Sequence, residues 1–258
     1  PIRIGLIGLG RVARTYLRWH ERLRWQGVVQ HVIACDLLEK HRDDALNTYG
    51  FAYFTTNYED VIARSDVDIV LIYTSMQTHG PIALDALTEG KHVQVEKPFA
   101  PNLEIGRQLV EAARTSAGFL VPAPYSILSP TYRILWSRIH KGDIGRPYMA
   151  RSLYGHAGPT WGPWFYQKGG GAMFDLGVYN LTSLTGLLGP AKRVMAMSCS
   201  AVHERIIDGQ TIPVEADDNS HTLLDFGDAA FAVASTGFTI QKYRTPGIEV
   251  YGSKGTVQ

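Results

Sequence analysis

Residues 2–13 have the sequence IRIGLIGLGRVA, and this stretch decides the fold of the N-terminal half. Its first six residues form a short apolar run that is followed by a glycine, which predicts a buried strand. Gly8, Gly10 and Ala13 fit the pattern G-x-G-x-x-A, which joins a strand to a helix in dinucleotide-binding folds. The first glycine permits the tight turn, the second lets a pyrophosphate approach the backbone, and the alanine lets helix and strand pack closely. The residues expected to bind the cofactor phosphates at the helix N-terminus are Gly8, Gly10, Arg11 and Val12.

Strands and helices alternate along the rest of this half. The expected strands are residues 2–7, 28–35, 53–54, 69–73, 92–95 and 119–121. Between them, apolar residues recur at helical spacing, first at Val12, Tyr16, Trp19 and Leu23. This alternation predicts an α/β fold with a doubly wound parallel sheet that is covered by helices on both faces. Prolines at 122 and 124 place the expected boundary between an NAD-binding domain, residues 1–122, and a second domain, residues 123–258.

The second half of the chain shows a different order of expected helices and strands. We expect helices at residues 131–140 and around 175–179, and strands after Pro147 and at 193–199, 220–226, 229–236 and 248–251. Gly227-Asp228 is the expected hairpin turn. The prediction is an α+β domain with a large, open, mostly antiparallel sheet and helices on one face. Residues 250–258 resemble a strand–turn–strand, and we expect the chain to stop inside this sheet, as a truncated domain would.

Asp36 follows the second expected strand. A carboxylate at that place would accept hydrogen bonds from both hydroxyls of an adenosine ribose and would repel a 2′-phosphate. Leu37 and Leu38 follow it, so no arginine stands directly after it. The sequence therefore favours NAD over NADP. The alternative is a glycine turn in a generic α/β protein, with Asp36 as a helix cap.

Polar residues follow two further strands, at the edge where parallel sheets gather ligands. Thr74, Gln77 and His79 lie after one strand, and Glu96 and Lys97 after the next. We expect all five to contribute to cofactor binding. His79 either caps the following helix or touches the cofactor, and Lys97 is either catalytic or a solvated lysine at a strand end.

Residues 169–180 have the sequence GGGAMFDLGVYN. If this stretch is helical, Asp175 and Tyr179 are four residues apart and point the same way. That pair is a candidate catalytic site. The alternative is Asp175 as a helix N-cap and Tyr179 as an ordinary half-buried tyrosine.

Together with GLGRVA at 8–13 and THGPIALDALTEGKHVQVEKPFA at 78–100, this segment resembles the glucose–fructose oxidoreductase/inositol dehydrogenase/MocA family. The resemblance implies a Rossmann domain and a substrate domain, which oxidise or reduce sugars, polyols and related alcohols with NAD(P). It maps the family's lysine to Lys97, its aspartate to Asp175 and its acid/base to Tyr179. It also implies a homo-oligomer, a dimer or tetramer, assembled through the C-terminal sheet.

Hydride transfer needs a group that removes or donates the hydroxyl proton. A tyrosine has an ordinary pKa of about 10, so Tyr179 would act more easily as an acid in reduction, and oxidation should prefer alkaline pH. An ammonium from Lys97 would assist ionisation of the phenol, and Asp175 would orient the substrate hydroxyl or pair with Lys97. Flat aromatic rings suit the C–H face of a sugar, which makes Tyr125, Trp161 and Trp164 candidate substrate contacts. The alternative for these rings is packing between domains or subunits.

Composition excludes several functions. Lys plus Arg number 25 against 24 acids, and no basic cluster marks a nucleic-acid surface. No apolar run is long enough to span a bilayer. The two cysteines fit no metal or disulfide pattern, so we expect no metal and a reducing, cytoplasmic location. Two competing functions stay open: a glycoside hydrolase that retains NAD, and a non-catalytic sugar or nucleotide sensor.

Overall fold

The computed structural model describes residues 1–245 and 247–258. The chain forms two compact units, Pro1–Ala123 and Pro124–Gln258, and each is described by itself. Among the described residues, no helix combines the length and the apolar character that crossing a membrane requires.

The first unit is built on a parallel sheet with the strand order β3-β2-β1-β4-β5-β6. The predicted doubly wound sheet is confirmed, and its strand order reverses between β1 and β4, where such folds bind dinucleotides. The elements are β1 (Ile2–Ile7), α1 (Arg11–Trp25), β2 (Val29–Cys35), η1 (Glu39–His41), η2 (Asp44–Thr48), β3 (Tyr53–Thr55), α2 (Glu59–Ile62), β4 (Ile69–Ile72), α3 (Met76–Thr88), β5 (His92–Val95), α4 (Leu103–Thr115) and β6 (Leu120–Pro122).

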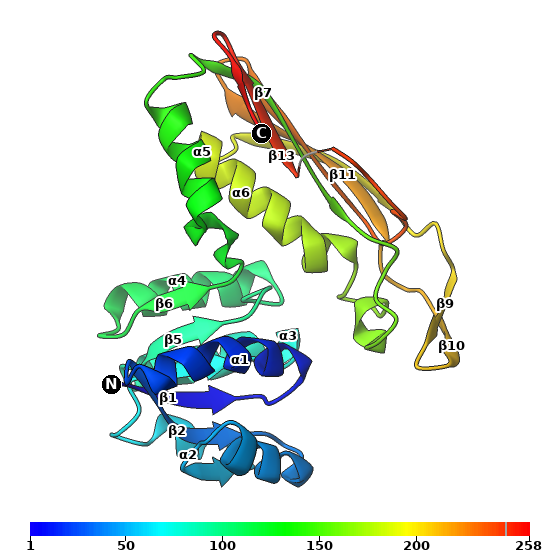
Figure 1. Ribbon diagram of the computed structural model, residues 1–258. Coiled ribbons are helices and arrows are strands. Elements are labelled where there is room, and N and C mark those ends of the chain that lie inside the picture. Colours follow the sequence, from blue (N-terminus) through cyan, green and yellow to red (C-terminus); the bar gives the residue numbers. More distant parts are fainter. Residues whose placement is uncertain (246) are drawn as a thin grey trace. The chain divides into compact units, whose positions relative to one another are not determined.

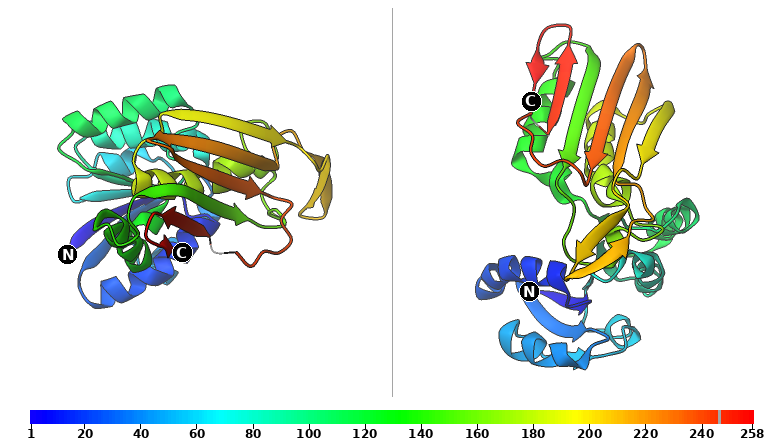
Figure 2. Two further views of the ribbon diagram at one scale, coloured as in Figure 1. Left: turned by 90° about the horizontal axis from the view of Figure 1, so that it is seen from above. Right: turned by 90° about the vertical axis from the view of Figure 1, so that its right-hand side faces the viewer.

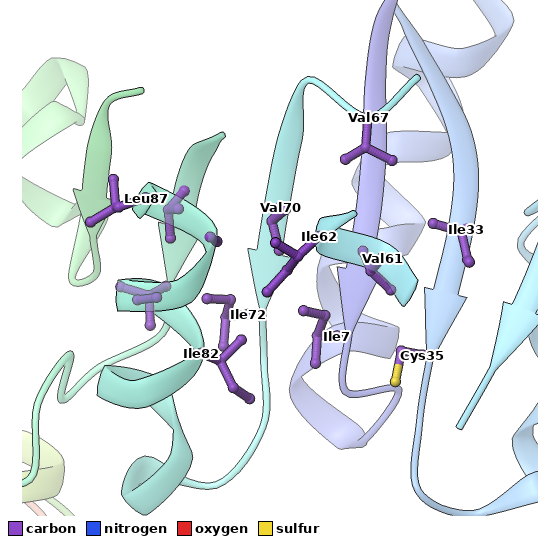
Figure 3. Packing of buried hydrophobic residues seen from close by; sticks show 14 of the residues in the cluster. Ile7, Ile33, Cys35, Val61, Ile62, Val67, Val70, Ile72, Ile82 and Leu87 are labelled. Atoms are coloured by element: carbon purple, nitrogen blue, oxygen red, sulfur yellow. The ribbon is translucent and has the colours of Figure 1, made fainter. Parts of the chain in front are cut away.

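Each face of this sheet has its own apolar core. On one face Ile7 and Ile72 pack with Ile82 and Leu87 of α3, as Figure 3 shows. On the other face the strands pack against α1. The sheet is therefore buried on both sides, which explains its nearly continuous apolar strands.

The face that α1 buries differs from the apolar stripe seen in the sequence. Ala13 and Leu17 are the buried residues of this helix, whereas Val12, Trp19 and Leu23 are exposed. Helix α1 is confirmed, but the small Ala13 makes the close contact with the sheet. Spacing alone indicates that a helix forms, and side-chain size decides which face fits against the strands.

The second unit has a mixed sheet with the order β14-β13-β7-β12-β11-β8. Among its described strand pairs, β7–β12 is parallel and the others are antiparallel. Helices α5 and α6 lie on the same face of this sheet (Figure 1). The predicted mostly antiparallel sheet with helices on one face is confirmed. The elements are η3 (Tyr125–Leu128), α5 (Pro130–His140), β7 (Pro147–Gly155), η4 (Pro163–Phe165), η5 (Met173–Gly177), α6 (Val178–Leu188), β8 (Arg193–Cys199), β9 (Glu204–Ile207), β10 (Gln210–Pro213), β11 (Asn219–Gly227), β12 (Ala230–Gly237), β13 (Ile248–Gly252) and β14 (Thr256–Val257).

Two hairpin turns differ from the prediction. The turn between β11 and β12 consists of Asp228 and Ala229, both with positive φ, and it lies one residue later than expected. The hairpin β9–β10 was not predicted, and it extends beyond one end of the larger sheet (Figure 2). Its turn, Asp208-Gly209, also has positive φ at both residues, as a type I′ hairpin turn requires.

Candidate functional site

The glycine turn after β1 has the geometry of a phosphate cradle. Gly8 has φ +94°, and a β-carbon there would lie 2.7 Å from the carbonyl oxygen of Tyr73. Only glycine fits this conformation and this contact. A β-carbon at Gly10 would meet no described atom within 4 Å, so this side of the turn faces open space. These two glycines fit the pyrophosphate of a dinucleotide, which needs a close approach to the backbone.

Helix α1 begins at this turn. Its N-cap is Gly10, and no side chain of the described residues caps it. No acidic residue lies in its first turn. Arg11 and Val12, which were predicted to bind phosphates, form that first turn and are exposed. The backbone N–H groups of the turn and the positive end of the helix dipole are therefore suited to binding an anion.

Asp36 is fixed by the backbone around it. Its Oδ2 accepts a hydrogen bond of 2.8 Å from Leu9 N, inside the glycine turn, and its Oδ1 accepts one of 2.9 Å from Leu38 N. The next helical segment, η1, has Leu38 as its N-cap, without a side-chain cap. The alternative of Asp36 as a helix cap is therefore wrong. The carboxylate instead ties the end of β2 to the turn that follows β1.

Glu96 is a buried carboxylate that connects two elements. Its Oε1 accepts 2.7 Å from the hydroxyl of Tyr16 on α1, and its Oε2 accepts 3.1 Å from the backbone N of Lys97. Tyr16 stacks on Tyr73 with ring centroids 5.0 Å apart. Glu96 thus holds the backbone that carries the half-buried Lys97.

His79 joins the loops that follow β4 and β5. It is 2% exposed, and its Nδ1 lies 2.8 Å from the carbonyl oxygen of Pro98 and its Nε2 3.1 Å from that of Thr74. A neutral imidazole can donate to only one of two carbonyls. Burial lowers the pKa of His79, while the two backbone hydrogen bonds act in the opposite direction. Helix α3 has Ser75 as its N-cap, so His79 does not cap it.

Thr74 and Gln77 lie at the same edge. The Thr74 hydroxyl accepts 2.8 Å from that of Thr78. Gln77 is exposed in the first turn of α3. The structure therefore gathers the predicted cofactor residues of the first unit at the carboxyl ends of β1, β2, β4 and β5.

In the second unit, backbone conformation and close contacts together explain the three glycines at 169–171. Gly169 and Gly171 have positive φ. A β-carbon at Gly170 would clash with the carbonyl oxygen of Trp164, and one at Gly171 would lie 2.7 Å from Oδ1 of Asp217. The chain passes between these groups only because glycine has no side chain.

Asp175 lies in a single π-type turn, Met173–Gly177, that leads directly into α6. Its backbone N donates 3.1 Å to the carbonyl oxygen of Gly171, so it lies inside the helical segment and is not its N-cap. It is buried at 9% exposure. π-type turns are frequent at functional sites. Asp175 and Tyr179 lie on one continuous helical segment, as predicted.

Helix α6 is held on the sheet next to Tyr179. The amide oxygen of Asn180 accepts 2.5 Å from Ser152 on β7, and its nitrogen donates 3.0 Å to the carbonyl oxygen of Ser235 on β12. The ring of Tyr179 lies 5.0 Å from that of Tyr154, also on β7. Burial, the nearby Tyr243 and Asp175 raise the pKa of Tyr154. The sequence analysis did not single out Tyr154, since only the pairing of sheet and helix brings it here.

Two of the three predicted aromatic contacts, Trp161 and Trp164, belong to a cluster of rings. Trp161 lies edge-on to Trp164 at 5.5 Å and to Phe165 at 5.0 Å, and Phe165 packs edge-on to Phe238 at 6.3 Å. Trp164 is 43% exposed. Tyr125 is half-buried at the start of η3. The cluster thus has an anchored inner side and an exposed outer ring.

The candidate catalytic residues are divided between the units. Lys97 belongs to the first unit, and Asp175 and Tyr179 belong to the second. Within the described part of the chain, no group of three histidine, cysteine or acidic side chains has the geometry to hold a metal ion.

Comparison with known proteins assigns a family description to each half. A model described as an oxidoreductase family with an NAD-binding Rossmann fold matches residues 2–122. A model described as the GFO/IDH/MocA C-terminal domain matches residues 132–258.

Individual relatives match along nearly the whole chain. A 1,5-anhydro-D-fructose reductase from Ensifer adhaerens is 30% identical over 263 residues, which cover 99% of this chain and 74% of the relative. A trans-1,2-dihydrobenzene-1,2-diol dehydrogenase from Bos taurus is 26% identical over 272 residues, 100% of this chain and 73% of the relative. An NAD binding oxidoreductase from Klebsiella pneumoniae has a similar structure, with a TM-score of 0.88, 26% identity and coverage of 99% and 72%.

Proposed function

The chain belongs to the GFO/IDH/MocA family of NAD-binding oxidoreductases, and we propose that it transfers a hydride between NAD and a hydroxyl or carbonyl carbon of a sugar, polyol or cyclic diol. The enzyme class, an NAD-dependent dehydrogenase or reductase, follows from the family. The observation that carries the substrate proposal is the 30% identity to a 1,5-anhydro-D-fructose reductase along 99% of the chain.

We propose that residues 1–122 hold NAD and that residues 123–258 bind the substrate. When bound, the nicotinamide supplies or accepts the hydride. Gly8 and Gly10 would receive the pyrophosphate at the N-terminus of α1, and Asp36 would bind the adenosine ribose. The open space at Gly10 and the anchored carboxylate of Asp36 support these roles.

We propose that Tyr179 is the acid/base. Its phenol would give a proton to a carbonyl oxygen during reduction and take one from a hydroxyl during oxidation. Asp175 would orient the substrate hydroxyl, and Lys97 would stabilise negative charge on the oxygen or the phenolate. The buried position of Asp175 and the sheet-anchored helix that carries Tyr179 support this assignment, and family membership supports the participation of Lys97.

The relatives' names define the substrate class that we propose. They include an inositol 2-dehydrogenase from Salmonella typhimurium, 27% identical over 60% of this chain, besides the reductase and diol dehydrogenase above. The compounds in these names share a ring that carries adjacent oxygen substituents. The exposed ring of Trp164, with Trp161 behind it and Tyr125, would contact the C–H face of such a ring.

The test is a panel of sugars, polyols and cyclic diols with NAD and NADP between pH 6 and 10, followed by NADH absorbance. Oxidation should rise with pH above neutrality, and Tyr179→Phe should lower kcat by about 10²-fold or more. Tyr148→Phe is the control, because Tyr148 is an exposed tyrosine of the same unit. A flat pH profile together with full activity of Tyr179→Phe would remove Tyr179 from the mechanism.

The same assay separates two other functions of the fold. A glycoside hydrolase that retains NAD would release sugar without net NADH. A non-catalytic sensor would bind NADH or sugar without turnover of any panel member. The presence of Lys97, Asp175 and Tyr179 together supports the dehydrogenase.

We further propose that the chain forms a homo-oligomer through its second sheet. The register places exposed apolar side chains on one face of neighbouring strands, and these are Met149, Phe231, Val233, Leu223, Met195 and Met197. Exposed apolar patches of this kind commonly mark subunit interfaces. Light scattering would test this proposal by measuring the mass of the particle in solution.

Both cysteines are free thiols, which supports the proposed reducing, cytoplasmic compartment.

A further inference from the structure

His41 lies beside the carboxylate of Asp36 at the end of η1. Its Nδ1 is 3.1 Å from Oδ1 of Asp36, and the two side chains are only 15% and 13% exposed. This Nδ1 is buried, and it makes no well-aligned hydrogen bond with any of the described residues. The contact with Asp36 is therefore a close approach of two polar groups and not a completed hydrogen bond.

A count of hydrogen-bonding positions shows what this place can still bind. A carboxylate oxygen can accept two hydrogen bonds. Oδ2 of Asp36 already accepts from Leu9 N, and Oδ1 accepts from Leu38 N, so each oxygen keeps one position. The imidazole nitrogen next to Oδ1 also lacks an aligned partner. A buried polar atom in this state is expensive, which makes it a natural contact for a ligand.

Neighbouring charged groups do not fill this need. The guanidinium group of Arg42 pairs with Glu39, and that of Arg14 pairs with Asp44 at 2.8 Å. His41 itself is oriented by its backbone N, which donates 3.0 Å to the carbonyl oxygen of Leu38. The imidazole and the carboxylate are thus both placed by the same short segment after β2.

We propose that His41 is a second binding residue for the adenosine ribose of the dinucleotide, acting on the same hydroxyl as Asp36. A hydroxyl both donates and accepts. It would donate to Oδ1 of Asp36 and accept from the N–H of His41, which completes both groups at once. A 2′-phosphate has no proton for Asp36 at neutral pH, so the pair selects a hydroxyl. The inference rests on the proposed role of Asp36 at the ribose.

The test compares NADH with reduced nicotinamide mononucleotide, which lacks the adenosine ribose, in fluorescence titrations of the whole chain. His41→Ala should raise the Kd of NADH about 3- to 10-fold, as the loss of one hydrogen bond predicts, and should leave that of the mononucleotide unchanged. His41→Asn, whose amide N–H lies close to the position of Nδ1, should restore most of the affinity. His92→Ala is the matched histidine control, because His92 begins β5 and so lies at the end of that strand away from the proposed cofactor edge.

Two results would overturn the proposal. One is wild-type affinity of His41→Ala for NADH, and the other is equal weakening of both ligands, which indicates a merely structural role. A second measurement needs no stable variant, because NADH analogues that lack the adenosine 2′- or 3′-hydroxyl bind to the wild-type chain. At least one analogue should lose at least the factor lost by His41→Ala, because the missing hydroxyl also bonds to Asp36, and full affinity for both analogues contradicts the inference.

Asp36→Asn distinguishes this inference from the proposed function. If this variant keeps both its NADH affinity and its preference over NADPH, the role of Asp36 fails and the inference falls with it. If Asp36→Asn is impaired and His41→Ala is not, only the inference about His41 fails.

Discussion

Alanine substitutions at Gly8 and Gly10 should affect the protein in opposite ways. At Gly8 the new β-carbon meets only backbone atoms, at 2.7 and 2.8 Å from the carbonyl oxygen and carbon of Tyr73 and 2.9 Å from the nitrogen of Thr74. Backbone atoms cannot rotate out of the way, and φ is +94°. At Gly10 the β-carbon meets nothing described within 4 Å, and φ −76°, ψ −165° is an extended conformation that any residue adopts.

The structure gives the size of each effect. Left-handed backbone costs a residue with a β-carbon about 1–2 kcal/mol, and steric overlap adds about 1–3 kcal/mol. Gly8→Ala should therefore destabilise the free protein by about 2–5 kcal/mol, which lowers Tm by roughly 4–20 °C. Gly10→Ala should leave Tm unchanged or raise it, since replacing an unstrained glycine stabilises by about 0.4–1 kcal/mol through the unfolded chain.

Gly10→Ala should weaken NADH binding even though it leaves the stability of the free protein intact. The methyl group at Gly10 occupies the space that we assign to the pyrophosphate, so Gly10→Ala should raise the Kd of NADH at least about tenfold, or 1.4 kcal/mol. The measurements are Tm without and with NADH, because a ligand that binds the folded state raises Tm, together with fluorescence titration. The reasoning is refuted if Gly10→Ala is as unstable as Gly8→Ala, or if it binds NADH as the wild type does.

Three further predictions concern residues away from this turn. Burial lowers the pKa of His31 to about 4 from an ordinary 6.5. The stabilisation that depends on its neutral form is therefore complete above pH 6.5, and about 3 kcal/mol of it is lost as the pH falls towards 4. In urea unfolding over this range, the free energy of unfolding of the wild type should fall by about 3 kcal/mol more than that of His31→Gln. In the variants His79→Gln and His79→Leu, glutamine keeps a hydrogen-bond donor and leucine keeps none. The Kd of NADH should therefore rise in the order wild type, His79→Gln, His79→Leu, and equal affinities would exclude a role of His79 in holding the two loops. Met195→Lys puts a charge on the exposed face of β8 and should shift an oligomer towards monomer in light scattering, whereas an unchanged mass would place the interface elsewhere.

The sequence features from which the fold was predicted are local. The strand before Gly8, the turn at Gly8 and the start of the helix after it lie within the twelve residues 2–13, and the turn requires particular residue types for steric reasons. The segment with Asp175 and Tyr179 was likewise predicted as helical. Its π-type turn was not, since nothing in the spacing distinguishes five-residue from four-residue hydrogen bonding. The β9–β10 hairpin was missed although Asp208-Gly209, directly after Ile206-Ile207, is a strong hairpin signal.

The functions of several predicted site residues depended on long-range contacts. Glu96 was predicted to bind the cofactor, and its carboxylate accepts from the backbone N of Lys97 and from Tyr16, which is 80 residues away in the sequence. For His79, capping and cofactor contact were the alternatives; the helix cap is Ser75, and the buried ring of His79 links two loops. No local pattern contains these partners, because they form only when the strands take their order in the sheet.

These contacts form a connected set along the ligand edge of the first sheet. Asp36 fixes the glycine turn through Leu9, Glu96 fixes the backbone at the end of β5 to α1 through Tyr16, and His79 fixes that loop to the end of β4. Each bond is largely shielded from water, so its loss leaves a polar group unpaired. Loops held in this way lose little conformational freedom when a dinucleotide binds, and preorganisation of this kind increases affinity. Removal of any one link should therefore weaken NADH binding even where the altered side chain never touches the cofactor.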